Sequence, residues 1–100
     1  MIVDEAFNPQ RGHGCYQLTR VHRLDGHTLR VRVYRDSYAF QSTATVEVLT
    51  PTLTWTVLAN QPPGDWWHDT NHTASRASLR AVADRLINRA RTILHPPTNR

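Results

Sequence analysis

The strongest constraint in this sequence is a change of hydrophobic period along the chain. Between residues 15 and 60 apolar and polar residues alternate, as where Leu29, Val31 and Val33 are separated by arginines. This alternation is typical of a β-strand with one buried face. From residue 74 apolar residues recur every three or four positions, as on one stripe of a helix. The stripe comprises Leu79, Val82, Ala83, Leu86, Ala90 and Ile93.

These two periods predict an α+β fold, an antiparallel four-stranded β-meander followed by one long C-terminal amphipathic helix packed on one sheet face. A chain of 100 residues suffices for one such domain. We place it at residues 15–95, with a flexible N-terminal segment at 1–14 and a flexible tail at 96–100. Thr73 or Ser75 is the expected N-cap of the helix.

The first hairpin has two interpretations, because Asp-Gly at 25–26 can close a loop of two or three residues. A three-residue loop sets Val21 beside Leu29. A two-residue loop points Arg20 and His22 into the core. Burial of an arginine costs free energy unless it is paired. We therefore prefer the three-residue loop, together with a bulge in the first strand.

The later strands follow from pairing Arg35 with Tyr38 across a turn at 36–37. This register puts Val33 opposite Phe40 and Leu29 opposite Ala44 on the buried face. In the fourth strand the same logic points three residues inward: Leu53, Trp55 and Val57. Small residues on the facing surfaces indicate where the helix crosses the sheet. They are Ser42, Ala44, Ala83 and Ala90.

Trp66, Trp67 and His68 form the most unusual stretch. As a binding loop, the aromatic rings would anchor a protein partner, and we name these three residues as the candidate partner-binding site. The competing interpretation folds one tryptophan back over the open end of the core. That interpretation is favoured for one of the two rings, because burying an aromatic ring gains free energy.

The chain contains twelve arginines and no lysine, and the net charge is +4 with histidine neutral. Arginine suits phosphate, but the codon bias of a GC-rich bacterial genome also explains a preference that covers the whole chain. A nucleic-acid-binding alternative, to RNA or DNA, would use the outer sheet face and the hairpin ends. Its residues would be Arg23, Arg30, Arg32, Tyr34 and Arg35.

Catalytic and metal motifs are not evident in the sequence. Cys15 is the only cysteine, which argues against a disulfide and against a structural zinc site. We expect no enzyme activity, no metal and no cofactor. Without a signal peptide or a long apolar run, a cytoplasmic protein without membrane contact is expected.

The sequence therefore predicts a small non-enzymatic binding or accessory domain that acts through protein–protein interaction. Its partner would be a second copy, giving a homodimer, or another protein for which it acts as adaptor or inhibitor. Nucleic-acid binding is the alternative.

Overall fold

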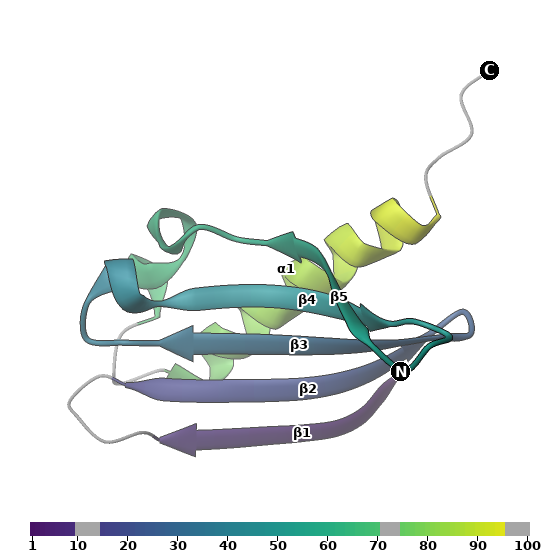
Figure 1. The fold of residues 1–100 in the computed structure, drawn as a ribbon. Helices are drawn as coiled ribbons and strands as arrows, with labels where there is room; N and C mark the ends of the chain where they lie inside the picture. Colours follow the sequence, from purple (N-terminus) through teal and green to yellow (C-terminus); the bar gives the residue numbers. More distant parts are fainter. Residues whose placement is uncertain (10–14, 71–74, 96–100) are drawn as a thin grey trace.

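The computed structural model describes residues 1–9, 15–70 and 75–95. It shows one antiparallel sheet whose strands lie in the order of the sequence, followed by one helix (Figure 1). The strands are β1 (Ile2–Pro9), β2 (Tyr16–Leu24), β3 (His27–Arg35), β4 (Thr43–Leu49) and β5 (Trp55–Asn60), and the helix is α1 (Ser75–Leu94). The α+β meander with a C-terminal helix is confirmed, with five strands rather than four.

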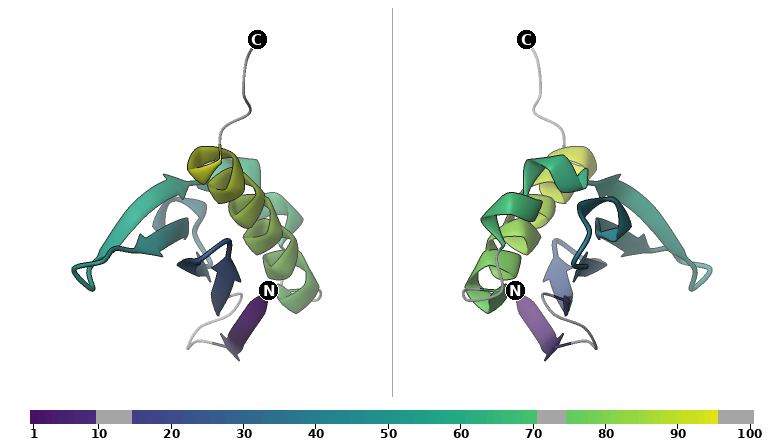
Figure 2. Two further views of the ribbon diagram at one scale, coloured as in Figure 1. Left: turned by 90° about the vertical axis from the view of Figure 1, so that its right-hand side faces the viewer. Right: turned by 90° about the vertical axis from the view of Figure 1, so that its left-hand side faces the viewer.

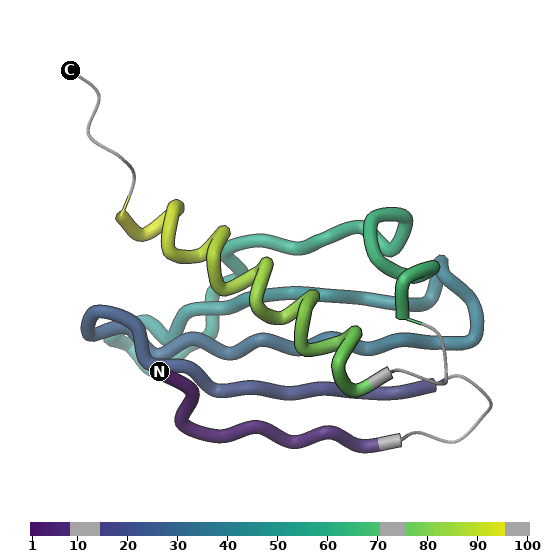
Figure 3. The backbone as a smooth tube through the Cα atoms, turned by 180° about the vertical axis from the view of Figure 1, so that it is seen from behind, coloured from purple at the N-terminus to yellow at the C-terminus, as the bar shows by residue number. Residues whose placement is uncertain are grey.

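The helix covers one face of the sheet and leaves the other without a helix (Figure 2). It crosses the strands diagonally, from β2 toward β5 (Figure 3). The stripe from Leu79 to Ala90 is buried against the sheet as expected, but Ile93 is 45% exposed near the helix end. Ala83 and Ala90 on the helix and Ala44 on the sheet are all buried, which allows close approach of the two layers.

The strand β1 was not anticipated, because residues 1–14 were expected to be a flexible segment. It pairs antiparallel with β2, with Phe7 opposite Leu18 and Glu5 opposite Arg20. The inward face of β1 therefore carries the carboxylate of Glu5 beside the apolar Phe7, so the sequence lacks the apolar alternation that identified the other strands. The rest of the expected flexible segment, residues 10–14, and the expected flexible tail, 96–100, lie outside the described residues. Thr73, one of the two N-cap candidates, also lies outside them.

The first hairpin has the two-residue turn, not the preferred three-residue loop. Asp25 and Gly26 adopt φ values of 49° and 85°, and Leu24 pairs with His27. Two left-handed residues form the turn that matches the natural twist of a hairpin. Arg20 therefore faces inward, opposite Val31, and β2 pairs with β3 without a bulge.

The second hairpin is wider than expected. A short 3₁₀ helix, η1 (Ala39–Gln41), connects β3 to β4, so Val33 pairs with Ala44 and Leu29 with Val48. The register differs from the expected one by an even number of residues, so Ala44 still faces inward. Phe40, expected in the core, lies in the connection and is 80% exposed.

The strand β5 presents the opposite face from the one expected. Trp55 pairs with Leu49 and Val57 with Glu47, on the helix-free face. The connection at residues 50–54 reverses the parity, with Leu53 in a left-handed conformation at φ 63°. The predicted inward positions of Leu53, Trp55 and Val57 are therefore wrong.

The helix α1 does not meet the requirements of a membrane span. It is 20 residues long, but neither it nor any shorter helix in the described ranges is apolar enough along its length to cross a bilayer.

Candidate functional site

The tryptophan pair is divided between the core and the surface. Trp66 is fully buried, and its Nε1 donates to the carbonyl of Gln61 at 3.1 Å. Trp67 is half-buried, and its Nε1 donates to the carbonyl of Asp36 at 2.9 Å. The structure thus takes Trp66 out of reach of a partner. A binding role for Trp67 and the exposed His68 stays a prediction.

An exposed aromatic turn lies beside the tryptophans at the same end of the sheet. Tyr38 is 62% exposed and Phe40 is 80% exposed, with their ring centroids 5.8 Å apart. The turn is held by Asp36, whose Oδ1 accepts from the backbone N–H of Tyr38 at 3.0 Å. The side chain of Ser42 also donates to the Tyr38 carbonyl. Two exposed rings on a fixed turn are typical of anchors in protein interfaces.

The charge state of this turn is fixed near neutral pH. Tyr34 donates its hydroxyl to Asp36 Oδ2 at 2.7 Å. This hydrogen bond raises the pKa of Tyr34 to about 12. The same bond, with the backbone N–H of Tyr38, lowers the pKa of the Asp36 carboxyl. Both groups therefore keep their charge state at neutral pH.

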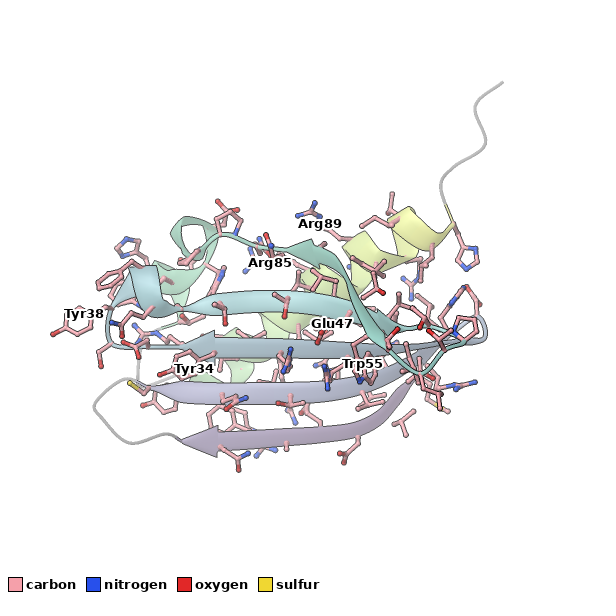
Figure 4. The ribbon with its side chains drawn as sticks, viewed as in Figure 1. Tyr34, Tyr38, Glu47, Trp55, Arg85 and Arg89 are labelled. Carbon is pink, nitrogen blue, oxygen red and sulfur yellow. The ribbon has the colours of Figure 1, made fainter. Side chains whose placement is uncertain are left out.

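The outer sheet face carries an arginine–glutamate–tryptophan cluster (Figure 4). Glu47 is almost buried and accepts from Arg30 Nε at 3.0 Å and from Arg32 Nη2 at 3.1 Å. The Arg30 guanidinium also stacks on the Trp55 ring at 4.3 Å. Glu47 thus forms ion pairs with both arginines. The pairing lowers the net charge that the face offers to phosphate.

Each of the other three residues of the nucleic-acid alternative already has a hydrogen-bond partner. Arg23 donates to the Thr28 hydroxyl at 2.7 Å, and Tyr34 is bonded to Asp36. Arg35 is buried and donates to Thr70 at 3.1 Å. The structure therefore brings Arg30, Arg32 and Tyr34 together on β3 but places Arg35 in the interior.

The open edge of β5 is the second exposed apolar feature. Val57 is 54% exposed and Leu53, in the preceding turn, is 79% exposed. The strand contains neither a charged residue nor a proline. Thr50 N donates to Thr54 O at 2.8 Å. In an antiparallel ladder, hydrogen-bonded residue pairs alternate with pairs that are not hydrogen-bonded. Counting from Thr54, the backbone N–H and C=O of Trp55 and Val57 therefore point away from β4, toward the edge.

Two helix arginines lie beside this edge. Arg85 and Arg89, four residues apart, project from α1 next to β5 (Figure 4). Arg89 Nη1 donates to the carbonyl of Asn60 at 3.3 Å. Within the described ranges, neither arginine has a carboxylate at ion-pair distance. The β5 side of the helix is thus a positively charged border along an uncharged strand.

Small-molecule and metal sites find little support in the described part of the chain. A hollow of about 160 Å³ lies between the ends of β4 and β5, below the roughly 300 Å³ at which ligand sites begin. No group of three histidine, cysteine or acidic residues that could hold a metal occurs in the described part of the chain. The buried Cys15 has its Sγ 3.4 Å from the Ser37 hydroxyl.

Comparisons with protein-family models, with curated proteins and with solved structures found no match to this chain. The sequence predicts that the first and fourth of its expected strands could be sheet edges open to pairing, because they lack interior proline and lysine. The structure places β5 at an edge, whereas β2 is covered by β1. The exposed turn was missed because Phe40 satisfied the alternation of a strand.

Proposed function

We propose that this chain is a protein-binding domain without catalytic function, and that its partner adds an extended strand to the edge of β5. The observation that carries the proposal is the uncharged, proline-free edge strand with exposed backbone groups and an apolar outer row. Edges of this kind are usually protected in monomeric proteins. Strand addition is a common mode of peptide recognition, in which backbone hydrogen bonds give affinity and alternate side chains give specificity.

The side chains of β5 support the same proposal. Trp55 and Val57 project on the helix-free face, where a partner's alternate side chains would contact them. Trp55 is fixed by the Arg30 guanidinium at 4.3 Å, so its ring needs little ordering on binding. Each ladder hydrogen bond contributes about 0.5–1.5 kcal/mol net. Four such bonds together with burial of this apolar row suit a moderate, reversible interaction.

The exposed aromatic turn extends the proposed surface at the far end of β5. The turn η1 lies near the short helix η2 (Pro63–Asp65), which follows β5 in the chain. Tyr38 and Phe40 would then contact the partner beyond the paired strand, as anchor residues. Of the predicted tryptophan loop, Trp67 and His68 lie close enough to the turn to contribute, because Trp67 is bonded to Asp36.

Nucleic-acid binding is less well supported. A phosphate site needs arginine donors that are not already occupied by carboxylates. Arg30 and Arg32 share Glu47, and Arg35 is buried. A protein partner would cover the apolar row and form hydrogen bonds with the open backbone groups of β5, which a polynucleotide would not.

The proposal is tested by selecting binders from a random peptide display library on the immobilised full chain, followed by affinity measurements with two variants. Val57→Pro removes the edge-facing N–H, and proline is tolerated on edge strands when that N–H is not in the ladder. Val57→Thr is the matched control, because it keeps the N–H and the β propensity.

The selected peptides should bind wild type and Val57→Thr similarly and bind Val57→Pro roughly tenfold more weakly, equivalent to about 1.4 kcal/mol. Circular dichroism and urea unfolding would confirm that both variants fold. Equal binding by a folded Val57→Pro protein, or a library that yields no binder, would refute strand addition at β5.

A further inference from the structure

We propose that the segment bound at the β5 edge is acidic, with carboxylates at alternate positions facing Arg85 and Arg89 and apolar side chains facing Trp55 and Val57. This inference rests on the proposed function and names the chemistry of the partner. It follows from the positions of the two helix arginines relative to the open edge.

The geometry of an added strand sets the alternation. Successive side chains of a strand point to opposite faces of the sheet. One set would join the row of Trp55 and Val57 on the helix-free face. The other set would lie on the helix side, where Thr56 pairs with the inward Val48 and is nevertheless exposed. The helix therefore leaves this part of the inner face uncovered, and a partner's side chains have room there.

The surface beside this uncovered part of the inner sheet face is positively charged. Arg85 and Arg89 lie on the β5 side of the helix, and Arg89 already reaches the carbonyl of Asn60 at 3.3 Å. On the opposite side of the helix, Arg80 contacts Glu5 and Asp84 contacts Arg20. On the β1 side Arg80 thus has an acidic partner within the described chain, whereas Arg85 and Arg89 on the β5 side have none at ion-pair distance there. A carboxylate on the partner would give Arg85 or Arg89 an ion pair like the one between Arg80 and Glu5.

A second copy of this chain fits the edge less well. Antiparallel pairing of β5 with its own copy about a two-fold axis keeps both helices on the same face of the joined sheet. Arg85 and Arg89 of both copies would then line one seam, and like charges would face each other. A single-stranded polynucleotide would satisfy the arginines but not the edge N–H of Val57.

The test uses three fluorescein-labelled eight-residue peptides that alternate valine with glutamate, serine or lysine. Binding to the full chain is measured by fluorescence polarisation at low and at physiological salt. The glutamate peptide should bind roughly fivefold more tightly than the serine peptide, as expected for two exposed ion pairs, and the lysine peptide most weakly. Raising the salt should reduce the difference.

Two charge variants with the same change in net charge make the test specific. Arg85→Glu/Arg89→Glu should reverse the order, so that the lysine peptide binds best. Arg23→Glu/Arg91→Glu changes exposed arginines away from the β5 edge and should preserve the order. Val57→Pro should weaken all three peptides.

The outcomes separate the two proposals. Equal affinity for the glutamate and serine peptides, with loss in Val57→Pro, would refute the acidic preference and leave strand addition standing. Binding that Val57→Pro does not weaken would refute both. Light scattering that shows a dimer lost in Val57→Pro would place a second copy at the edge instead. Displacement of the glutamate peptide by an oligothymidylate that binds Val57→Pro equally well would indicate a nucleic-acid site.

Discussion

The two edges of the sheet are built differently. On β1, Glu5 is part of an ion-pair network that also contains Arg20, Arg80 and Asp84. The β1 strand also carries Asp4 and ends in Pro9. The β5 strand contains no charged residue and no proline, and within the described ranges its neighbouring arginines, Arg85 and Arg89, have no carboxylate at ion-pair distance. Both edges have an irregular register with their neighbour, so a bulge alone does not distinguish them.

This difference shows how one helix can close one side of a sheet and leave the other accessible. Charged groups on an edge, and a proline within it, discourage pairing with further strands. On the β1 side two exposed helix charges, Arg80 and Asp84, form ion pairs with the mostly buried Glu5 and the buried Arg20 of the sheet. On the β5 side the helix packs against the strand, and the hydrogen bond between them, among the residues that the structure describes, runs from Arg89 to the carbonyl of Asn60. The stability of the domain should therefore depend on the β1 side and its binding on the β5 side.

The largest effect is expected for Arg20→Ala. Arg20 is 3% exposed and bonds Glu5 Oε2 at 2.9 Å and Asp84 Oδ1 at 2.6 Å. Its removal leaves the mostly buried Glu5 with the exposed Arg80 as its remaining partner. We expect a loss of roughly 3–5 kcal/mol in the free energy of unfolding, as measured by urea denaturation.

The matched control is Arg85→Ala, on the same helix side as Arg89. Because Arg85 is exposed and has no acidic partner among the described residues, its removal should change stability by about 0.5 kcal/mol or less. Similar losses for the two variants would contradict the proposed division between the edges.

A smaller effect, of the opposite sign, is expected for Leu53→Asn. Leu53 adopts φ 63° at the β4–β5 turn and is 79% exposed. A left-handed conformation costs a branched apolar residue about 1–2 kcal/mol, and asparagine adopts it more readily. The variant should be more stable by up to about 1 kcal/mol in thermal unfolding. A loss of stability would mean that Leu53 makes apolar contacts that outweigh the strain.

The smallest expected effect is the change in the free energy of unfolding at acidic pH. Burial alone would raise the pKa of Glu5, but hydrogen bonds and charges from Arg80 and Arg20 outweigh it, and the pKa lies below its usual 4.5. A carboxyl whose pKa falls on folding stabilises the native state above its unfolded pKa, and this contribution is lost as the pH decreases through the folded value.

The free energy of unfolding should therefore fall below pH 4.5, and Glu5→Gln should reduce the dependence. Urea denaturation at neutral pH and at about pH 3 measures this difference. An unchanged pH profile in Glu5→Gln would assign the acid sensitivity to other carboxylates.

The period of the apolar residues was enough to predict which side chains are buried in the parts of the fold where the parity was right. Val31, Val46 and Leu86 are buried as expected, because a register error of an even number of residues does not move them to the other face. Parity could not be predicted where a turn length was uncertain. The pairing of Arg20 with Glu5 and Asp84, residues distant in sequence, removed the cost that had made the two-residue turn unattractive.

The candidate site was harder to predict, because its residues match core patterns. Trp55 and Val57 alternate like buried residues, and only the odd-length connection at 50–54 shows that they face outward. The tryptophan pair illustrates the partial success. One ring was expected to fold over the core, and Trp66 does so, but the sequence could not say which of the two it would be.

The ion-pair network has a kinetic consequence for a chain that folds as a meander. Neighbouring strands can form a sheet through short loops, so most of the assembly requires little loop closure. Arg20 and Asp84 are 64 residues apart, and Glu5 and Arg80 are 75 apart. We expect such contacts to form only after the helix has docked, late in folding. They should then slow the unfolding of the domain more than they speed its folding, and so determine how long it stays folded.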